Sequence, residues 1–153
     1  MAGEAQQLAE LPLCDLADGL RNGEFSATEV MAATLARIDH LDPHLNAFIW
    51  CDSERAMERA READVALQRG DDVGPLHGVP LAHKDMFYRK GRVSTCGSKI
   101  MRDHIQDVTS TALERLEAAG ALYMGSLHMS EFAAGPTGHN DHYGPCRNPW
   151  NLD

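Results

Sequence analysis

The sequence predicts an α/β fold, and two observations carry this prediction. Apolar residues recur at helical spacing through most of the first seventy residues, whereas short apolar strands and a helical segment alternate after Gly74-Pro75. The chain has 153 residues, of which 43% are hydrophobic. It is therefore long enough to bury one sizeable core.

Residues 1–72 are predicted to be mainly helical. A short helix is expected from Leu13 to Leu20, ended by Asn22-Gly23. Ser26 and Glu29 have the spacing of a capping box, so a longer amphipathic helix is expected to begin there. Asp42-Pro43 is expected to end that helix, since the residue before a proline is disfavoured in the α region. A third helix is predicted from Ser53 to Arg69, with a stripe of small residues and Gly70 as its stop.

Residues 73–153 are predicted to form the α/β part. A strand is expected over 76–85, in which Val79, Leu81 and His83 face one way and Ala82 and Lys84 the other. A helix over 107–119 and an apolar strand over 121–124 are expected to follow. The stretch 135–153 is rich in Gly, Pro, Asn and His and is predicted to be an irregular loop.

Charge and composition limit the kinds of binding partner and the cellular compartment that the sequence predicts. The 23 acidic and 14 basic side chains give a formal charge of −9, which disfavours nucleic acid and anionic membranes as direct partners. The polar start and the lack of a run of about 18 apolar residues predict a cytoplasmic protein without a membrane span. The four cysteines, which are widely spaced, are expected to be free thiols: Cys14, Cys51, Cys96 and Cys146.

Lys84 is the residue whose position most suggests chemistry. It ends an apolar strand on the same side as Ala82, where its amine would be carried toward packed surface. Burial disfavours a charged amine, and a neutral lysine can act as a base. An ion pair with Asp85 or a plain surface lysine are the alternatives that spacing alone leaves open.

The segment Gly74 to Asp85, with the sequence GPLHGVPLAHKD, resembles the G-P-L-x-G-[IV]-P-[IVL]-x-x-K-D motif of amidase signature enzymes. Further matches follow in the same order as in that family. They are Ser26 to Asn46 with Leu45 to Phe48, Ser94 to Ser98, Leu116 to Gly125, Met129 to Ala133, Tyr143-Gly144, and Arg147 to Asn151.

This resemblance implies the N-terminal part of an amidase signature fold, a mixed sheet flanked by helices. It also implies an amidase that hydrolyses carbon–nitrogen amide bonds of a small-molecule substrate through a Ser-cis-Ser-Lys triad, without a cofactor. Lys84 matches the catalytic lysine, whereas the family's serines lie in a glycine-rich loop with no counterpart in 1–153. We therefore expect 1–153 to be an incomplete portion of a single amidase domain, and to be inactive alone.

Two details of the resemblance concern substrate recognition. Ala133 and Ala134 match positions that line the acyl pocket in family members, although a tightly packed helix turn is an equally good interpretation. Where the family commonly reads G-K-T-N-M, this chain has Gly125-Ser126-Leu127-His128-Met129. That departure leaves the assignment of the triad lysine unchanged and bears on substrate preference.

Alternatives from other classes remain open. The chain could belong to the A subunit of a glutamine-dependent tRNA amidotransferase, which resembles these hydrolases and works with partner subunits. It could also be a truncated binding or assembly module without chemistry, and a homodimer is possible in either case. A metal site at His128, His139, Asp141 and His142 is disfavoured, because these residues would mostly hang on a glycine-rich loop.

Overall fold

The computed structural model describes residues 7–71 and 73–152, which divide into two compact units. The described residues of the first unit are 7–40, 52–71, 73–81 and 115–124, and those of the second unit are 41–51, 82–114 and 125–152. The chain passes several times from one unit to the other, so α3, α5 and two strands have residues in both.

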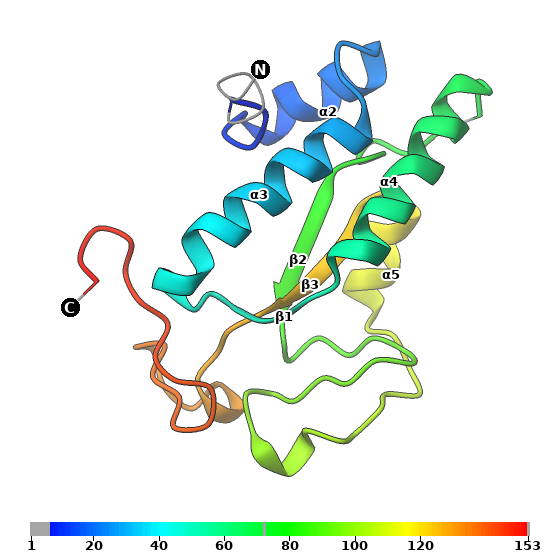
Figure 1. The fold of residues 1–153 in the computed structure, drawn as a ribbon. Coiled ribbons are helices and arrows are strands. Elements are labelled where there is room, and N and C mark those ends of the chain that lie inside the picture. The colour runs from blue at the N-terminus through cyan, green and yellow to red at the C-terminus, as the bar shows by residue number, and fades with distance from the viewer. Residues whose placement is uncertain (1–6, 72, 153) are drawn as a thin grey trace. The chain divides into compact units, whose positions relative to one another are not determined.

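Helices and strands alternate after residue 74, as the sequence predicts, but a strand at Phe48–Cys51 also lies within the part that was predicted to be mainly helical (Figure 1). The helices are α2 (Leu13–Asn22), α3 (Ala27–Leu45), α4 (Ser53–Gln68) and α5 (Thr111–Ala118), with short 3₁₀ turns η1 (Lys99–Met101) and η2 (Glu131–Ala133). The strands are β1 (Phe48–Cys51), β2 (Pro80–Lys84) and β3 (Leu122–Leu127).

The three strands form a mixed sheet in the order β1-β3-β2. β1 runs antiparallel to β3, with Trp50 opposite Ser126 and Cys51 opposite Gly125. β2 and β3 are parallel, because their hydrogen bonds advance in the same direction along both strands: the amide of Leu122 donates to Val79, and that of Asp85 to Leu127. The predicted α/β class with a mixed sheet is confirmed.

The start of α3 shows the predicted capping box. The Ser26 amide donates to the Glu29 carboxylate at 2.8 Å, and the Glu29 amide donates to the Ser26 hydroxyl at 3.1 Å. The amides of Ala27 and Thr28 donate instead to the carboxylate of Asp64 on α4, at 2.6 and 3.1 Å. The first amides of α3 lack partners within the helix and donate instead to the Ser26 hydroxyl and to the Asp64 carboxylate of α4.

Replacing Asp64 with alanine is expected to lower the free energy of unfolding by about 2 kcal/mol, because two helix N-terminal amides and the Thr28 hydroxyl lose their acceptor. Urea denaturation followed by circular dichroism measures the change. Glu62→Ala, at an exposed position of the same helix, is the matched control. An equal, small loss in both variants would contradict the capping role of Asp64.

Buried side chains of the first unit come from the helices and from the segments around β2 and β3. On α3, Val30 and Met31 are fully buried. The small-residue stripe predicted on α4 is also buried, as the helix presents Ala56, Ala60 and Ala63 inward. Small side chains allow close approach of the helix backbone to its neighbours.

The end of α3 differs from the prediction, because the helix continues through Pro43 to Leu45. Proline costs the helix one hydrogen bond there, but the Asn46 amide still donates to the Asp42 carbonyl and closes a further turn. Asn46 then adopts a left-handed conformation with φ 52°, and the Asp42 carboxylate accepts the next two amides. The predicted end at Asp42-Pro43 is therefore wrong by one turn.

Two other predicted boundaries need correction. Residues 76–78 form a turn and the strand begins only at Pro80, since Gly78 has a φ of 80° and the Val79 amide donates to Leu76. The helix expected from 107 begins only at Thr111, because the Ser110 amide donates to the Tyr88 carbonyl. Strand β3 extends to Leu127, beyond the predicted end at 124, whereas the predicted helix over 53–69 and the irregular 135–152 stretch are confirmed.

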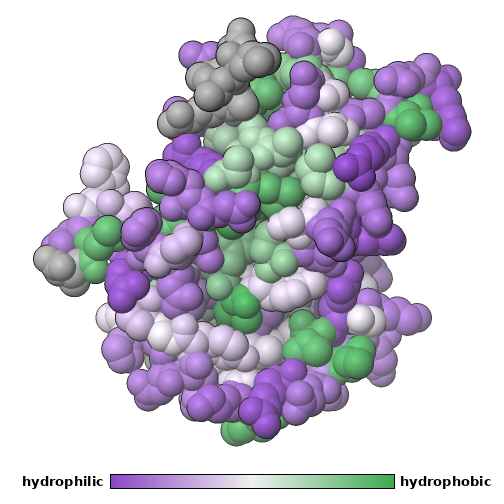
Figure 2. Space-filling model, in the orientation of Figure 1, coloured by the Kyte–Doolittle hydropathy of each residue, from purple (hydrophilic) through white to green (hydrophobic). Residues whose placement is uncertain are grey.

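No described helix is both long and apolar enough to cross a membrane. Polar residues cover most of the face drawn in Figure 2, and green apolar side chains interrupt that cover in several places. Large apolar side chains that are exposed in the second unit include Trp150 (95%), Ile100 (81%) and Phe132 (53%).

Candidate active site

Lys84 is the last residue of β2, and its side chain is exposed. The strand ends there because the Phe87 amide turns back to donate to the Lys84 carbonyl at 3.0 Å. The sequence predicted that the Lys84 amine points toward packed surface. This prediction is wrong, because the described residues leave the Lys84 side chain exposed. Its neighbour on the other face, His83, is buried as predicted.

Asp85, which follows Lys84, is 1% exposed. Its main chain extends the parallel pairing by donating to Leu127 at 3.2 Å, and its Oδ2 accepts the Thr95 amide at 2.7 Å and the Thr95 hydroxyl. These bonds fix the backbone at the end of β2. They argue against the ion pair between Lys84 and Asp85 that spacing alone left open, because the carboxylate is buried while the lysine is exposed.

The turn at Thr95 to Ser98, hereafter the 95–98 turn, connects Asp85 to η2. The Cys96 amide donates to the Asp85 carbonyl, and the Cys96 carbonyl accepts the Phe132 amide at 2.8 Å. Cys96 has a φ of 52° and Gly97 a φ of 68°, so the turn requires two left-handed residues in succession. Burial, and secondly the nearby Asp85 charge, raise the pKa of the Cys96 thiol.

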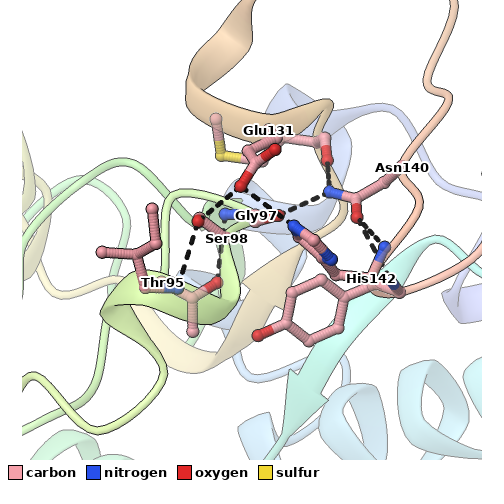
Figure 3. Close-up of polar contacts among 9 residues, drawn as sticks. Thr95, Gly97, Ser98, Glu131, Asn140 and His142 are labelled. Atoms are coloured by element: carbon pink, nitrogen blue, oxygen red, sulfur yellow. Dashed lines mark hydrogen bonds and ion pairs between the residues drawn. The ribbon is translucent and has the colours of Figure 1, made fainter.

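Glu131 joins the 95–98 turn to the loop that follows η2 (Figure 3). Its Oε1 accepts the Ser98 hydroxyl at 2.5 Å and lies 3.0 Å from Nε2 of His142. The hydrogen bond from Ser98, followed by that from His142, lowers the pKa of Glu131 below its usual value of 4.5. Ionised Glu131 therefore stabilises the folded chain.

The variant Glu131→Gln is expected to unfold at a lower urea concentration than the wild type near pH 7, and the gap is expected to shrink as the pH falls below about 4.5. The sign follows because a lowered carboxyl pKa in the folded state stabilises the protein only where that carboxyl is ionised. Urea midpoints measured between pH 3 and 7 test this, with the exposed Glu114→Gln as control. A gap that does not depend on pH would contradict it.

Asn140, which is 3% exposed, connects the loop after η2 to the 95–98 turn and to Met129 (Figure 3). Its Nδ2 donates to the carbonyls of Gly97 and Met129 at 2.7 and 2.8 Å. Its Oδ1 accepts the amides of His142 and Tyr143 at 2.8 and 3.1 Å. One amide side chain thus satisfies four backbone groups from three segments.

Ala133 and Ala134 lie in and just after η2 and are exposed, so the tightly packed helix turn considered for them is wrong. Phe132 and Ala133 have φ values of 48° and 59°, a conformation that costs non-glycine residues energy. Hydrogen bonds through the 95–98 turn connect this segment to the backbone beside Lys84. The end of β2 with Lys84 and the η2 segment with Ala133 are therefore both connected to the 95–98 turn.

The histidines considered for a metal site have separate partners. His142 contacts Glu131, Nε2 of His128 lies 2.7 Å from the Gly144 carbonyl, and His139 is exposed with Asp141 3.7 Å away. Within residues 7–71 and 73–152, no group of three or more His, Cys, Asp or Glu side chains is arranged to hold a metal ion. The four cysteines are free thiols.

The supporting network of Asp85, Ser98, Glu131, Asn140 and His142 was not identified from the sequence as part of the site. Asp85, Ser98 and Glu131 fall within motifs that carry the family resemblance, so those motifs could have indicated them. Asn140 lies in a loop without periodicity and gives no such signal.

The α/β fold places Lys84 at the end of a strand, and hydrogen bonds connect that strand end to the segment of Ala133. Comparison with known families shows the class of protein. The Amidase family model matches residues 29–153. The chain therefore belongs to the amidase family, as the resemblance implied.

Known relatives agree with this membership. The chain is 48% identical over 143 residues to the A subunit of the glutamyl-tRNA(Gln) amidotransferase of Azotobacter vinelandii, a match that covers 94% of this chain and 29% of the relative. It resembles the crystal structure of peptide amidase from Stenotrophomonas maltophilia with a TM-score of 0.86 and 30% identity, over 96% of this chain and 31% of that one. It also resembles a protein from a vestigial complex related to the origin of an s-triazine catabolic enzyme. The TM-score is 0.88 and the identity 38%, over 93% of this chain and 31% of that one. The chain thus spans less than a third of the length of these proteins.

Proposed function

We propose that the whole protein is an amidase that hydrolyses a carbon–nitrogen amide bond of a small molecule, and that Lys84 is its base. The observation that carries the proposal is family membership over residues 29–153. Lys84, at the end of β2, is the residue that the motif resemblance matches to the family's catalytic lysine. Residues 1–153 would then be the N-terminal portion of a single amidase domain. We further propose a cytoplasmic location and no required cofactor.

In this proposal Lys84 acts as a neutral amine. It takes a proton from a bridging serine, which takes one from the serine whose oxygen attacks the amide carbonyl. The carbon–nitrogen bond then breaks, the leaving nitrogen takes up the proton, and water hydrolyses the resulting acyl ester. Both serines would come from polypeptide outside 1–153.

The surroundings of Lys84 support a site that further polypeptide completes. Met86 and Phe87 follow it and are exposed, as is Phe132 on the connected η2 segment. Apolar side chains of this size are normally covered. Covering them would also remove water from Lys84, and a desolvated amine is favoured in its neutral form.

A second candidate function is that of the A subunit of a glutamine-dependent tRNA amidotransferase. It is favoured by the curated relatives, since matches of 41% to 48% identity in several bacteria carry that name. The same triad would then release ammonia for a partner subunit, so the two functions share Lys84 and differ in the acceptor.

Two measurements on the complete protein test the proposal and separate these functions. Ammonia release is measured with glutamine and with other simple carboxamides, and co-purification with a second subunit is tested. Turnover of varied carboxamides by the protein alone supports the amidase, whereas release from glutamine only in a complex supports the amidotransferase. Residues 1–153 alone are expected to release no ammonia, and turnover by them would contradict the assignment of the serines.

A further inference from the structure

Two hydrogen bonds at consecutive residues attach η2 to the 95–98 turn. The Glu131 carboxylate accepts the Ser98 hydroxyl at 2.5 Å (Figure 3). The next amide along the chain, that of Phe132, donates to the Cys96 carbonyl at 2.8 Å. Ser98 is fully buried, so its hydroxyl has no water as an alternative partner. These two bonds fix the point at which the backbone enters η2.

The Glu131 carboxylate has a second partner in the loop after η2. Its Oε1 lies 3.0 Å from Nε2 of His142, and the His142 amide donates to the side chain of buried Asn140 at 2.8 Å. The Glu131 side chain is 42% exposed, so hydrogen bonds and not hydrophobic burial determine where it lies. A carboxylate held by two restrained partners is a rigid anchor for the backbone that follows.

The two residues after Glu131 have strained backbones. Phe132 and Ala133 have φ values of 48° and 59°, which is unusual for non-glycine residues and most of all for a bulky one. Packing against the described residues does not offset this cost, because both side chains are exposed. Such conformations persist only where surrounding bonds impose them, and they cluster at segments that contact ligands. The strain therefore indicates that the position of this segment matters for binding.

The same turn connects η2 to Lys84. Cys96, which accepts the Phe132 amide, donates its own amide to the carbonyl of Asp85 at 3.4 Å, and Asp85 directly follows Lys84. The 95–98 turn also donates two hydrogen bonds to the Asp85 carboxylate. The turn thus cannot shift without moving the end of β2. The attachment of η2 to this turn sets where Phe132 lies relative to Lys84.

We propose that Glu131 is a positioning residue that determines which amides bind beside Lys84. It holds η2 through Ser98 and His142, so that the apolar Phe132 contacts the part of the substrate that leads away from the reacting bond. Amides with longer, apolar acyl chains are the substrate class that such a contact favours. The inference rests on the proposed amidase function and deepens it, because it assigns the choice of acyl group to a side chain that takes no part in the reaction.

The kinetic test uses the complete protein and straight-chain primary amides from acetamide to hexanamide. Glu131→Ala is expected to raise KM for hexanamide by about tenfold or more and to change kcat by less than about threefold. The reason is that a contact away from the reacting bond stabilises the bound substrate and the transition state equally. The KM for acetamide, whose acyl group is too short to reach this contact, is expected to stay within about threefold.

Two control variants separate positioning from stability. Glu131→Gln keeps an oxygen that accepts from Ser98 and His142, so its KM for hexanamide is expected to stay within about threefold of the wild-type value, although the stabilising charge is lost. Asp64→Ala removes the cap of α3 in the first unit and lowers stability there. It is expected to leave the KM values of both amides unchanged.

Hydrogen exchange on the complete protein tests the positioning without a substrate. In the structure the amides of residues 132–134 all donate to backbone carbonyls. These amides are expected to exchange at least about tenfold faster in Glu131→Ala than in the wild type, because η2 loses its anchor. In Glu131→Gln they are expected to exchange at the wild-type rate.

Unchanged exchange in Glu131→Ala would overturn this inference alone, and so would an unchanged KM for hexanamide. An equal rise of that KM in Asp64→Ala would overturn it too, since KM would then follow stability. A wild-type protein that hydrolyses none of these amides would contradict the proposed function and, with it, the role of Glu131 in substrate choice.

Discussion

Replacing Lys84 with methionine in the complete protein is expected to lower kcat/KM for amide hydrolysis on the order of 10⁴-fold. Members of a catalytic triad act as a unit, so removing the base costs nearly as much as removing the nucleophile. Methionine keeps the length of the side chain and removes only the amine. The rate of ammonia release is measured at saturating and at low substrate to separate kcat from KM.

Lys99→Met is the matched control, since Lys99 is also an exposed lysine of the second unit and lies in η1. It is expected to retain the wild-type rate. Comparable losses in the two variants would show that a general charge effect, and not the amine at position 84, controls the reaction.

Replacing Asn140 with alanine is expected to lower the free energy of unfolding by about 3 kcal/mol or more, because four backbone groups lose their partner. Asn140→Asp is expected to cost at least as much near pH 7. A carboxylate would still accept the amides of His142 and Tyr143, but it would face the carbonyls of Gly97 and Met129 without a donor.

Urea denaturation of both Asn140 variants checks this expectation. Asn22→Ala, at an exposed position that ends α2, is the control and is expected to change stability by less than about 0.5 kcal/mol. Loss of less than about 1 kcal/mol in Asn140→Ala would contradict the bridging role, because a single lost hydrogen bond already accounts for that amount.

The sequence predicted the parts of the fold that depend on local chemistry. The Ser26 and Glu29 capping box, the left-handed stop at Gly23 and the small-residue stripe of α4 each act within a few residues of their own position. All three are present in the structure. The apolar pattern likewise placed Lys84 at the end of a strand.

Features that depend on distant partners were not predictable in this way. Helix α5 begins at Thr111 because Ser110 is bonded to Tyr88, and β1 has only four residues, without a pattern that distinguishes it from a loop. The cap that Asp64 supplies to α3 and the four bonds of Asn140 also join segments far apart in the chain. Spacing along a sequence does not reveal such pairs.

The amine at position 84 is tested most directly by chemical rescue of the complete Lys84→Ala protein. Hydrolysis is measured at increasing methylammonium, with tetramethylammonium, which cannot accept a proton, as the comparison. If Lys84 is the base, the rate is expected to rise with the concentration of free methylamine and to stay unchanged in tetramethylammonium. A Lys84→Ala protein that keeps the wild-type rate without added amine would contradict this role.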